Sequence, residues 1–300
     1  MGRSLTGTVV VALIALGLAA PTAARAQQVD LAGMWSANLG NHEERPLRGD
    51  PGVDVGEYIG VPLNDAARQH ALSWQATMHS LPEWQARPHP VTYSMRAPQP
   101  NFRMAPIINP ASQELIGYSV VGLFGGGDRE IWVDGRPHPS KYAEHKWQGF
   151  STGVWEGGVF KVTTTHIKYS FIHRNGIPLS PYTVMTEYYM RHGDLLTLVI
   201  ILDDPIYLDE PMVRTSTFKS DPLMVVRRTL PFEVAEEIPS LQRGQVPAWP
   251  LGSRRTDYAD IYGFPYETAM GGAHTMYPEY ATKLKAMMAD MPATSTAAAR

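Results

Sequence analysis

The succession of strand-like segments between residues 102 and 219 constrains the fold of this chain more than any other feature. Short runs rich in β-branched and aromatic residues alternate there with Gly, Pro, Asn and Asp turn signals. The runs cover residues 102–108, 115–124, 131–133, 159–167, 183–191, 195–202 and 212–219, and we expect another at 224–230. Many short strands joined by tight turns are typical of an antiparallel barrel or sandwich. We therefore expect an all-β fold of roughly nine or ten strands.

Two turn signals lie in the central stretch, residues 128–166. Asp134-Gly135 follows a strand-like run and predicts a type I′ hairpin, because both central residues of that turn need positive φ. Trp155-Glu156-Gly157-Gly158 predicts a second tight turn. The segment between the two turns concentrates aromatic, basic and imidazole side chains: Arg136, His138, Lys141, Tyr142, His145, Lys146 and Trp147. We expect the functional site in this segment.

Two helices are expected outside the strand region. Asn64 is a good N-cap, and residues 65–77 have helical composition with Ala67, Ala71 and Trp74 on one face. Residues 280–288 predict a helix near the C-terminus, after Pro278. No domain boundary is visible, so we expect one barrel domain over residues 27–290 with both helical parts packed on its outside.

The first 26 residues have the pattern of a signal peptide. Arg3 supplies a positive charge, residues 9–18 an apolar run, and Ala24-Arg25-Ala26 a small-residue cleavage site. We expect a periplasmic protein without membrane insertion, and a disordered tail at residues 291–300. The chain has no cysteine, which excludes disulfides, thiol catalysis and a cysteine lipid anchor.

Charge and aromatic content narrow the class of partner. The chain carries 26 basic and 29 acidic residues, a formal net charge of −3, so nothing indicates nucleic-acid binding. The 14 Tyr and 7 Trp residues offer flat apolar surface with a polar tip. They suit a cavity for a small aromatic or apolar ligand, or alternatively fill the β core. The sequence makes no prediction of oligomeric state.

Several motifs resemble those of known exported proteins. Gly33-x-Trp35 at the first strand resembles the start of lipocalin-like barrels, in which the Trp closes one end. The runs IWVDGRPHP (131–139), GVWEG (153–157) and TTTH (163–166) resemble an uncharacterised family of exported bacterial proteins. The resemblance extends over about residues 33–285 and implies a lipocalin-like β fold without established catalytic residues. Gly158 stands where that family commonly has an acidic residue.

An acid–base site is the main catalytic hypothesis. Strand alternation places His166 on the same interior face as Phe160, Val162 and Thr164, and groups Glu187 with Tyr189 on a neighbouring strand. A carboxylate beside an imidazole orients the ring and moves its pKa toward working pH. The alternative is a buried structural His–Glu hydrogen bond. His138 and His145 are the next acid–base candidates.

The remaining candidates concern ligand binding. Arg136, Lys141 and Lys146 are expected to hold an anionic group. Tyr142, Trp147, Trp132 and Tyr189 are expected to contact the ligand. A solvated basic loop is the alternative. His138, His145, His166 and His173 have no spacing typical of zinc, so neither a metal nor a cofactor is expected, and no G-x-S-x-G elbow occurs.

Two classes of function follow. One is a cofactor-independent lyase, isomerase or hydrolase acting on an aromatic or apolar molecule held in the barrel cavity. The other is a periplasmic lipocalin-like carrier of such a ligand. Inward-pointing polar residues discriminate between them, because a catalyst needs a convergent acid–base set and a carrier does not. His166, Glu187 and Arg136 favour the enzyme.

Overall fold

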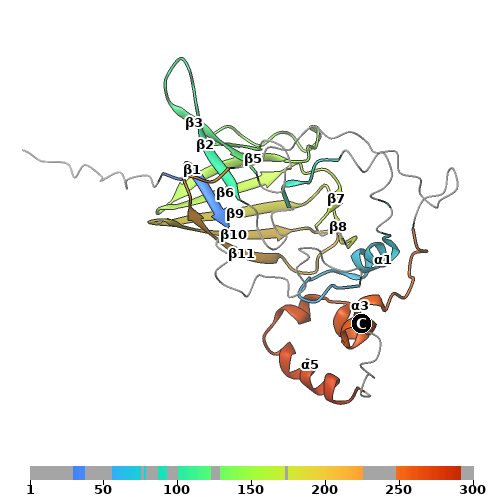
Figure 1. The fold of residues 1–300 in the computed structure, drawn as a ribbon. Helices are drawn as coiled ribbons and strands as arrows, with labels where there is room; N and C mark the ends of the chain where they lie inside the picture. The colour runs from blue at the N-terminus through green and yellow to red at the C-terminus, as the bar shows by residue number, and fades with distance from the viewer. Residues whose placement is uncertain are drawn as a thin grey trace, which may run out of the picture.

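Nine strands form a closed barrel in the computed structural model of this chain (Figure 1). The structure describes residues 30–37, 56–75, 78, 87–92, 101–122, 129–172, 175–225 and 248–291. The barrel strands are β1 (Gly33–Ala37), β2 (Phe102–Ile108), β3 (Leu115–Val121), β4 (Arg129–Trp132), β5 (Phe150–Glu156), β6 (Val159–Thr165), β9 (Val184–His192), β10 (Leu195–Asp203) and β11 (Met212–Ser220). Their order around the ring is β1-β11-β10-β9-β6-β5-β4-β3-β2. The expectation of a mainly β, barrel-like chain is confirmed. The expected signal peptide and residues 292–300 of the expected tail lie outside the described residues.

One pair of neighbouring strands in the ring is parallel. β4 and β5 run in the same direction, with Ile131 opposite Ser151, whereas the other eight pairings are antiparallel. A closed ring of nine strands cannot alternate direction at every step, because nine is odd. The expectation of an entirely antiparallel barrel is therefore wrong at this pair.

The parallel pair also overturns the hairpin predicted at Asp134-Gly135. Gly135 does adopt a positive φ of 78°, so a local turn is present. Two parallel neighbours need a crossover connection, however, because the chain must return to the end of the barrel where the first strand began. Residues 133–149 make this return and are called the crossover arm below. The predicted turn at residues 156–159 joins β5 and β6 as an antiparallel hairpin.

The barrel interior is filled by alternate residues of each strand. On β6 the inward residues Phe160, Val162 and Thr164 are fully buried, and the residues between them are half-buried. The same alternation places Met185, Glu187 and Tyr189 inward on β9. The largest fully buried side chains in the described core are Trp35, Tyr58, Tyr189, Phe102, Phe160 and Phe218.

β1 closes the ring by pairing with β2 on one side and β11 on the other. Trp35 is 1% exposed, and its indole N–H donates to the carbonyl of Leu31 at 3.0 Å. The guanidinium of Arg191, on β9, lies 5.2 Å from the centre of the Trp35 ring. Ser36 also donates to the carboxylate of Asp221 at 2.7 Å, just beyond β11. Together these contacts fix the N-terminal strand in the barrel wall.

The other end of the barrel carries the helices and a small sheet (Figure 1). Helix α1 (Asp65–Ser73) begins after Asn64, whose side chain accepts from the N–H of Ala67 as its cap signal predicts. It lies beside the two-stranded sheet of β7 (Ser170–Phe171) and β8 (Pro178–Leu179). The C-terminal extension contains α3 (Asp257–Tyr262), α4 (Tyr266–Ala269), η5 (Ala273–Met276) and α5 (Tyr280–Ala289).

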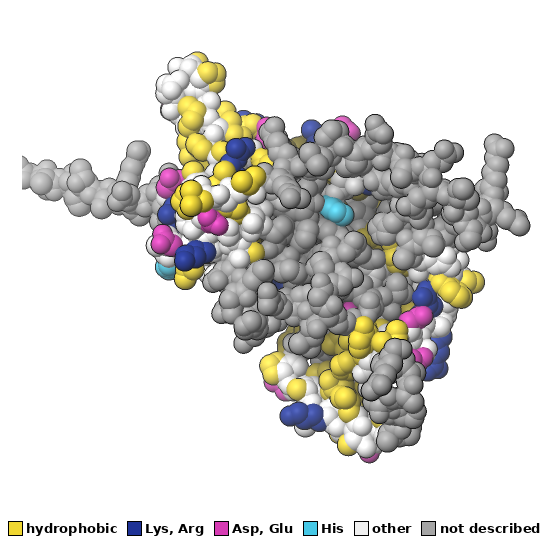
Figure 2. Space-filling view, in the orientation of Figure 1, with side chains coloured by type: hydrophobic (Ala, Val, Ile, Leu, Met, Phe, Trp, Pro, Cys, Tyr) yellow, Lys and Arg dark blue, Asp and Glu magenta, His cyan; other side chains and the backbone are white. Residues whose placement is uncertain are grey.

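Backbone hydrogen bonds join the C-terminal extension to residues 56–63. Tyr58 N–H donates to Ala269 at 2.9 Å, and Gly272 N–H donates to Val61 at 2.9 Å. Figure 2 shows apolar side chains on the surface of this extension, where the exposed ones include Ile261, Tyr277 and Met288. No helix in the described part of the chain is long and apolar enough to span a membrane.

Two strand predictions fail at their ends. β6 stops at Thr165 instead of residue 167, because His166 adopts a left-handed conformation with φ of +57°. The strand expected at 224–230 is absent at residues 224–225, and the rest of it lies outside the described residues.

Candidate functional site

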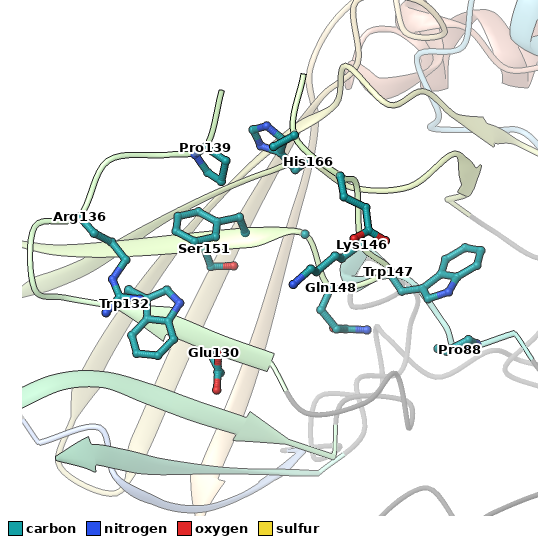
Figure 3. A pocket seen from close by; sticks show the side chains of 14 residues that line it. Pro88, Glu130, Trp132, Arg136, Pro139, Lys146, Trp147, Gln148, Ser151 and His166 are labelled. Atoms are coloured by element: carbon teal, nitrogen blue, oxygen red, sulfur yellow. The ribbon is translucent and has the colours of Figure 1, made fainter. Parts of the chain in front are cut away.

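A groove of about 760 Å³ lies between the crossover arm and the wall formed by β4 and β5. Figure 3 shows Trp132 and Arg136 together on one side and Lys146 and Gln148 across from them. The full lining is Pro88, Glu130, Trp132, Arg136, Pro139, Ala143, Glu144, Lys146, Trp147, Gln148, Gly149, Phe150, Ser151 and His166. The groove therefore draws most of its lining from the segment in which the sequence predicted the site.

The groove lies on the outer face of the barrel. Glu130 and Trp132 point outward because they alternate with Arg129 and Ile131, which are buried inside. The expected ligand cavity inside the barrel is a different place from this groove, and it stays a prediction. Buried core side chains occupy many of the described inward positions, and the crossover arm helps to form the hollow outside them.

The aromatic side of the groove is built from one cation–π contact and one ion pair. The guanidinium carbon of Arg136 lies 3.7 Å from the centre of the Trp132 ring. Arg136 Nε also donates to Asp134 at 2.8 Å, and this hydrogen bond lowers the pKa of the exposed Asp134 carboxyl. The charge of Arg136 is thus largely matched by Asp134, which leaves Arg136 less free to hold an anionic ligand than the sequence predicted.

Lys146 contributes the free cation of the groove. Its backbone is fixed, because its N–H donates to His166 at 2.8 Å and its carbonyl accepts from Lys168 at 3.0 Å. Within the described residues its ammonium makes no ion pair or hydrogen bond with the protein. The side chain is exposed and lines the hollow. Lys146 is therefore positioned to meet a polar or anionic group on a bound molecule.

Three of the predicted histidines fasten the crossover arm to the barrel. His138, on the arm, contacts the outward hydroxyls of Thr152 and Thr165, each at 2.8 Å. His166, directly after β6, contacts the same Thr165 hydroxyl through Nδ1 at 2.7 Å and the carbonyl of Ser140 through Nε2 at 2.9 Å. His145 Nδ1 meets the carbonyl of Ile167 at 3.0 Å.

These contacts leave one proton arrangement when His138 and His166 are both neutral. The Ser140 carbonyl only accepts, so His166 Nε2 carries its proton and Nδ1 accepts from the Thr165 hydroxyl. Thr165 must then accept from His138 Nδ1, and His138 Nε2 accepts from the hydroxyl of Thr152. Both nitrogens of both rings are occupied. Burial, followed by the nearby His166 ring, lowers the pKa of His138.

The predicted His166–Glu187 pair is not assembled. β6 and β9 are antiparallel neighbours as expected, but Glu187 lies opposite Val162 and points into the barrel. Its carboxylate forms a bidentate ion pair with Arg129, which includes an Nη1–Oε1 contact of 3.0 Å, and accepts from Tyr189 at 3.0 Å. His166 turns outward at its left-handed residue instead, so the strand alternation that predicted its partner ends one residue too early.

The buried ion pair belongs to a polar cluster that the sequence reasoning missed. Arg129 Nε donates to Ser151 at 3.1 Å, and its Nη2 donates to Thr164 at 2.7 Å. Ser151 and Thr164 also share a hydrogen bond of 2.9 Å. The sequence position of Arg129 could have revealed this cluster. Arg129 lies two residues before Ile131, so strand alternation places both side chains on the inward face. Each side chain of this cluster has hydrogen-bond partners within it, and the Arg129–Glu187 ion pair lies in the barrel core.

The other predicted site residues are distributed as follows. Trp147 lines the groove beside Pro88, with the ammonium of Lys168 5.5 Å from its ring centre (Figure 3). Tyr142 is 86% exposed on the arm and outside the groove lining. Tyr189 lies in the barrel core with Glu187. His173 lies outside the described residues. Within the described residues no three His, Cys, Asp or Glu side chains gather closely enough to hold a metal ion.

Comparison with protein-family models, with curated proteins and with solved structures gave no match for this chain. The groove and its residues are thus the basis for assigning a function.

Proposed function

We propose that this chain is a small-molecule-binding protein whose outer groove holds an aromatic or apolar ligand with an anionic group. The cavity of about 760 Å³ is within the usual range for small-molecule sites. Trp132 and Trp147 supply apolar surface, and the Lys146 ammonium supplies a charge that has no partner among the described residues. The resemblance to exported lipocalin-like proteins and the signal-peptide pattern support a periplasmic carrier.

One observation favours binding over acid–base catalysis. A general base needs a free lone pair within reach of the substrate, yet every ring nitrogen of His138 and His166 already has a partner on the protein. Glu187 is likewise committed to Arg129 inside the barrel. His138, His166 and Glu187 therefore hold the structure together, while the groove residues Trp132 and Lys146 face the space that a ligand would fill.

The enzyme remains a second proposal because His166 lines the groove. For His166 to accept a substrate proton, Nδ1 would have to exchange the Thr165 hydroxyl for the substrate. Native mass spectrometry of the purified protein, followed by incubation, separates the two proposals. A co-purifying molecule that stays unaltered supports the carrier, and one that is converted by the wild type but not by His166→Gln supports the enzyme.

Binding is tested directly with the aromatic anion 1-anilinonaphthalene-8-sulfonate as a fluorescent probe. We expect saturable binding at one site, weakened at least about tenfold by Lys146→Met, because a hydrogen bond to a charged group contributes about 1.5–3 kcal/mol. Lys141→Met is the matched control, since Lys141 is an exposed lysine of the same arm outside the groove lining. Equal affinity in both variants would contradict the assignment of the groove.

A further inference from the structure

The hydrogen bonds that fasten the crossover arm depend on how many protons the rings of His138 and His166 carry. The chain runs from Thr152 through His138, Thr165 and His166 to the carbonyl of Ser140, and we call it the histidine latch. Two of its members, His138 and Ser140, belong to the arm that roofs the groove, and the others belong to the barrel wall. Opening the latch would therefore free the part of the roof around His138 and Ser140, while the backbone hydrogen bonds of Lys146 hold the other part. The inference below rests on the proposed binding function.

The latch can accept one proton without losing a contact. If His166 is protonated, its Nδ1–H donates to the Thr165 hydroxyl, and that hydroxyl turns to donate to His138 Nδ1. His138 then carries its proton on Nε2 and donates to Thr152. Donor and acceptor exchange roles in the hydrogen bonds from Thr152 to His166, but each hydrogen bond keeps one donor and one acceptor.

A second proton breaks this balance. With both rings protonated, two N–H groups point at the single oxygen of Thr165, and the hydroxyl hydrogen has no acceptor in the chain. The two positive rings also repel each other across that oxygen, in a setting where burial already disfavours charge on His138. The repulsion is relieved when one imidazolium moves away, and His138 moves together with its part of the arm.

The charged groups around the latch do not compensate for the second positive charge. The His145 ring lies 5.2 Å from His166 and would add a third positive charge if protonated. Lys146 and Arg136 are cations in the same groove as His166. The nearby acids Glu130 and Glu144 are exposed, so their attraction is screened by water. From the described residues of β5 and β6 the latch meets uncharged groups, the hydroxyls of Thr152 and Thr165 and the ring of Phe150.

We propose that acidification opens the histidine latch, frees the crossover arm and releases the ligand from the outer groove. Burial lowers the pKa of His138 below the ordinary histidine value of about 6.5, so the second proton, and with it the opening, requires a pH below that value. A carrier with this latch holds its ligand near neutrality and gives it up in an acidic medium.

Hydrogen exchange tests the latch without a ligand. The N–H groups of Ala143, Lys146 and Gly149 are hydrogen-bonded within the arm or to His166. After correction for intrinsic exchange, we expect their protection to fall at least tenfold between pH 7.5 and pH 5.0, while amides of the β9–β10 hairpin keep theirs. Protection in the arm that is independent of pH would overturn the proposal.

His138→Gln is the decisive variant. A glutamine amide offers one donor and one acceptor to the two threonine hydroxyls and does not titrate. The arm of this variant should remain protected at pH 5.0, and a loss of protection equal to that of the wild type would overturn the proposal. Thr165→Val, which removes the bridging hydroxyl, provides a second check, because its arm should be weakly protected at both pH values.

Probe binding separates this inference from the function on which it rests. With 1-anilinonaphthalene-8-sulfonate we expect the wild type to lose at least tenfold in affinity between pH 7.5 and pH 5.0 and His138→Gln to lose less than threefold. Absence of probe binding at pH 7.5 would count against the groove as a ligand site, and hydrogen exchange would still decide whether the latch opens.

Discussion

The ion pair inside the barrel gives the sharpest test of how this fold is stabilised. Glu187 is 0% exposed and Arg129 3% exposed, and each is the principal charged partner of the other. Replacing Glu187 with Leu leaves a buried guanidinium whose remaining partners are the hydroxyl groups of Ser151, Thr164 and Tyr189. Removing one partner of a buried ion pair typically costs about 3–5 kcal/mol. That is a large part of the roughly 5–15 kcal/mol that stabilises a typical domain.

The double variant Arg129→Met/Glu187→Leu should be far less damaging. Both charges are then gone, and apolar replacements of a buried ion pair are often neutral or stabilising by about 1–4 kcal/mol. Ser151 and Thr164 keep their mutual hydrogen bond, whereas Tyr189 loses its acceptor, at about 1–3 kcal/mol. We expect the double variant within about 2 kcal/mol of the wild type, against about 3–5 kcal/mol for either single change.

Urea unfolding followed by tryptophan fluorescence measures all four proteins of this cycle. If Glu187→Leu does not fold, Glu187→Gln offers a milder change, because it removes the charge and keeps the shape. The reasoning is refuted if each single variant loses less than about 1 kcal/mol, or if the double variant loses the sum of the two single losses, since distant or independent groups behave additively.

Three further predictions follow from other contacts. Gly153→Ala should destabilise the barrel by about 1–3 kcal/mol, because the added Cβ would lie 2.3 Å from the ring of Phe160, and Phe160→Leu in the same chain should recover much of the loss in urea unfolding. Asp204→Asn should destabilise the fold by about 1–3 kcal/mol, because both oxygens of the buried carboxylate accept hydrogen bonds. One oxygen accepts from Ser180 N–H and the Thr183 hydroxyl at 2.6 and 2.9 Å, and the other accepts from the N–H groups of Ile206 and Tyr207. The control Asp203→Asn changes an exposed neighbour and should leave the melting temperature within about a degree or two. Burial lowers the pKa of His138 in the folded chain, whereas the unfolded chain keeps the ordinary histidine pKa of about 6.5. Between these two pKa values the unfolded chain binds a proton at His138 more readily than the folded chain does. The free energy of unfolding should therefore fall as the pH drops below about 6.5 and level off below the pKa of His138 in the folded chain. The melting temperature of His138→Gln should depend less on pH than that of the wild type, and an equal dependence would contradict this prediction.

Local patterns in the sequence were sufficient for several of the individual strands, although β5 was not among the predicted runs. Alternation correctly placed Phe160, Val162 and Glu187 inward, because a half-buried strand repeats every two residues wherever it lies in the fold. The cap at Asn64 also marked the start of α1. The range of β2 was predicted to the residue, since Pro and Asn turn signals bound it on both sides.

The global arrangement could not be predicted in the same way. Whether Asp134-Gly135 joins two antiparallel strands or begins a crossover depends on how many strands close the ring, which no local window contains. The same is true of Arg129, whose partner Glu187 lies 58 residues further along the chain. The prediction for His166 failed for a different reason: one residue with positive φ redirects a side chain, and histidine adopts both backbone conformations.

The position of β1 has a consequence for how the chain is made. Synthesis produces β1 before its neighbours, and the partner of Ser36 is Asp221, 185 residues later. At about 5–20 residues per second, that interval lasts roughly 10–40 s. Throughout it the growing sheet has two unpaired edges, which are the surfaces through which strands of different molecules associate. Only the arrival of β11 turns this open sheet into a ring without edges, so most of the time needed to make the chain is spent in its most aggregation-prone form.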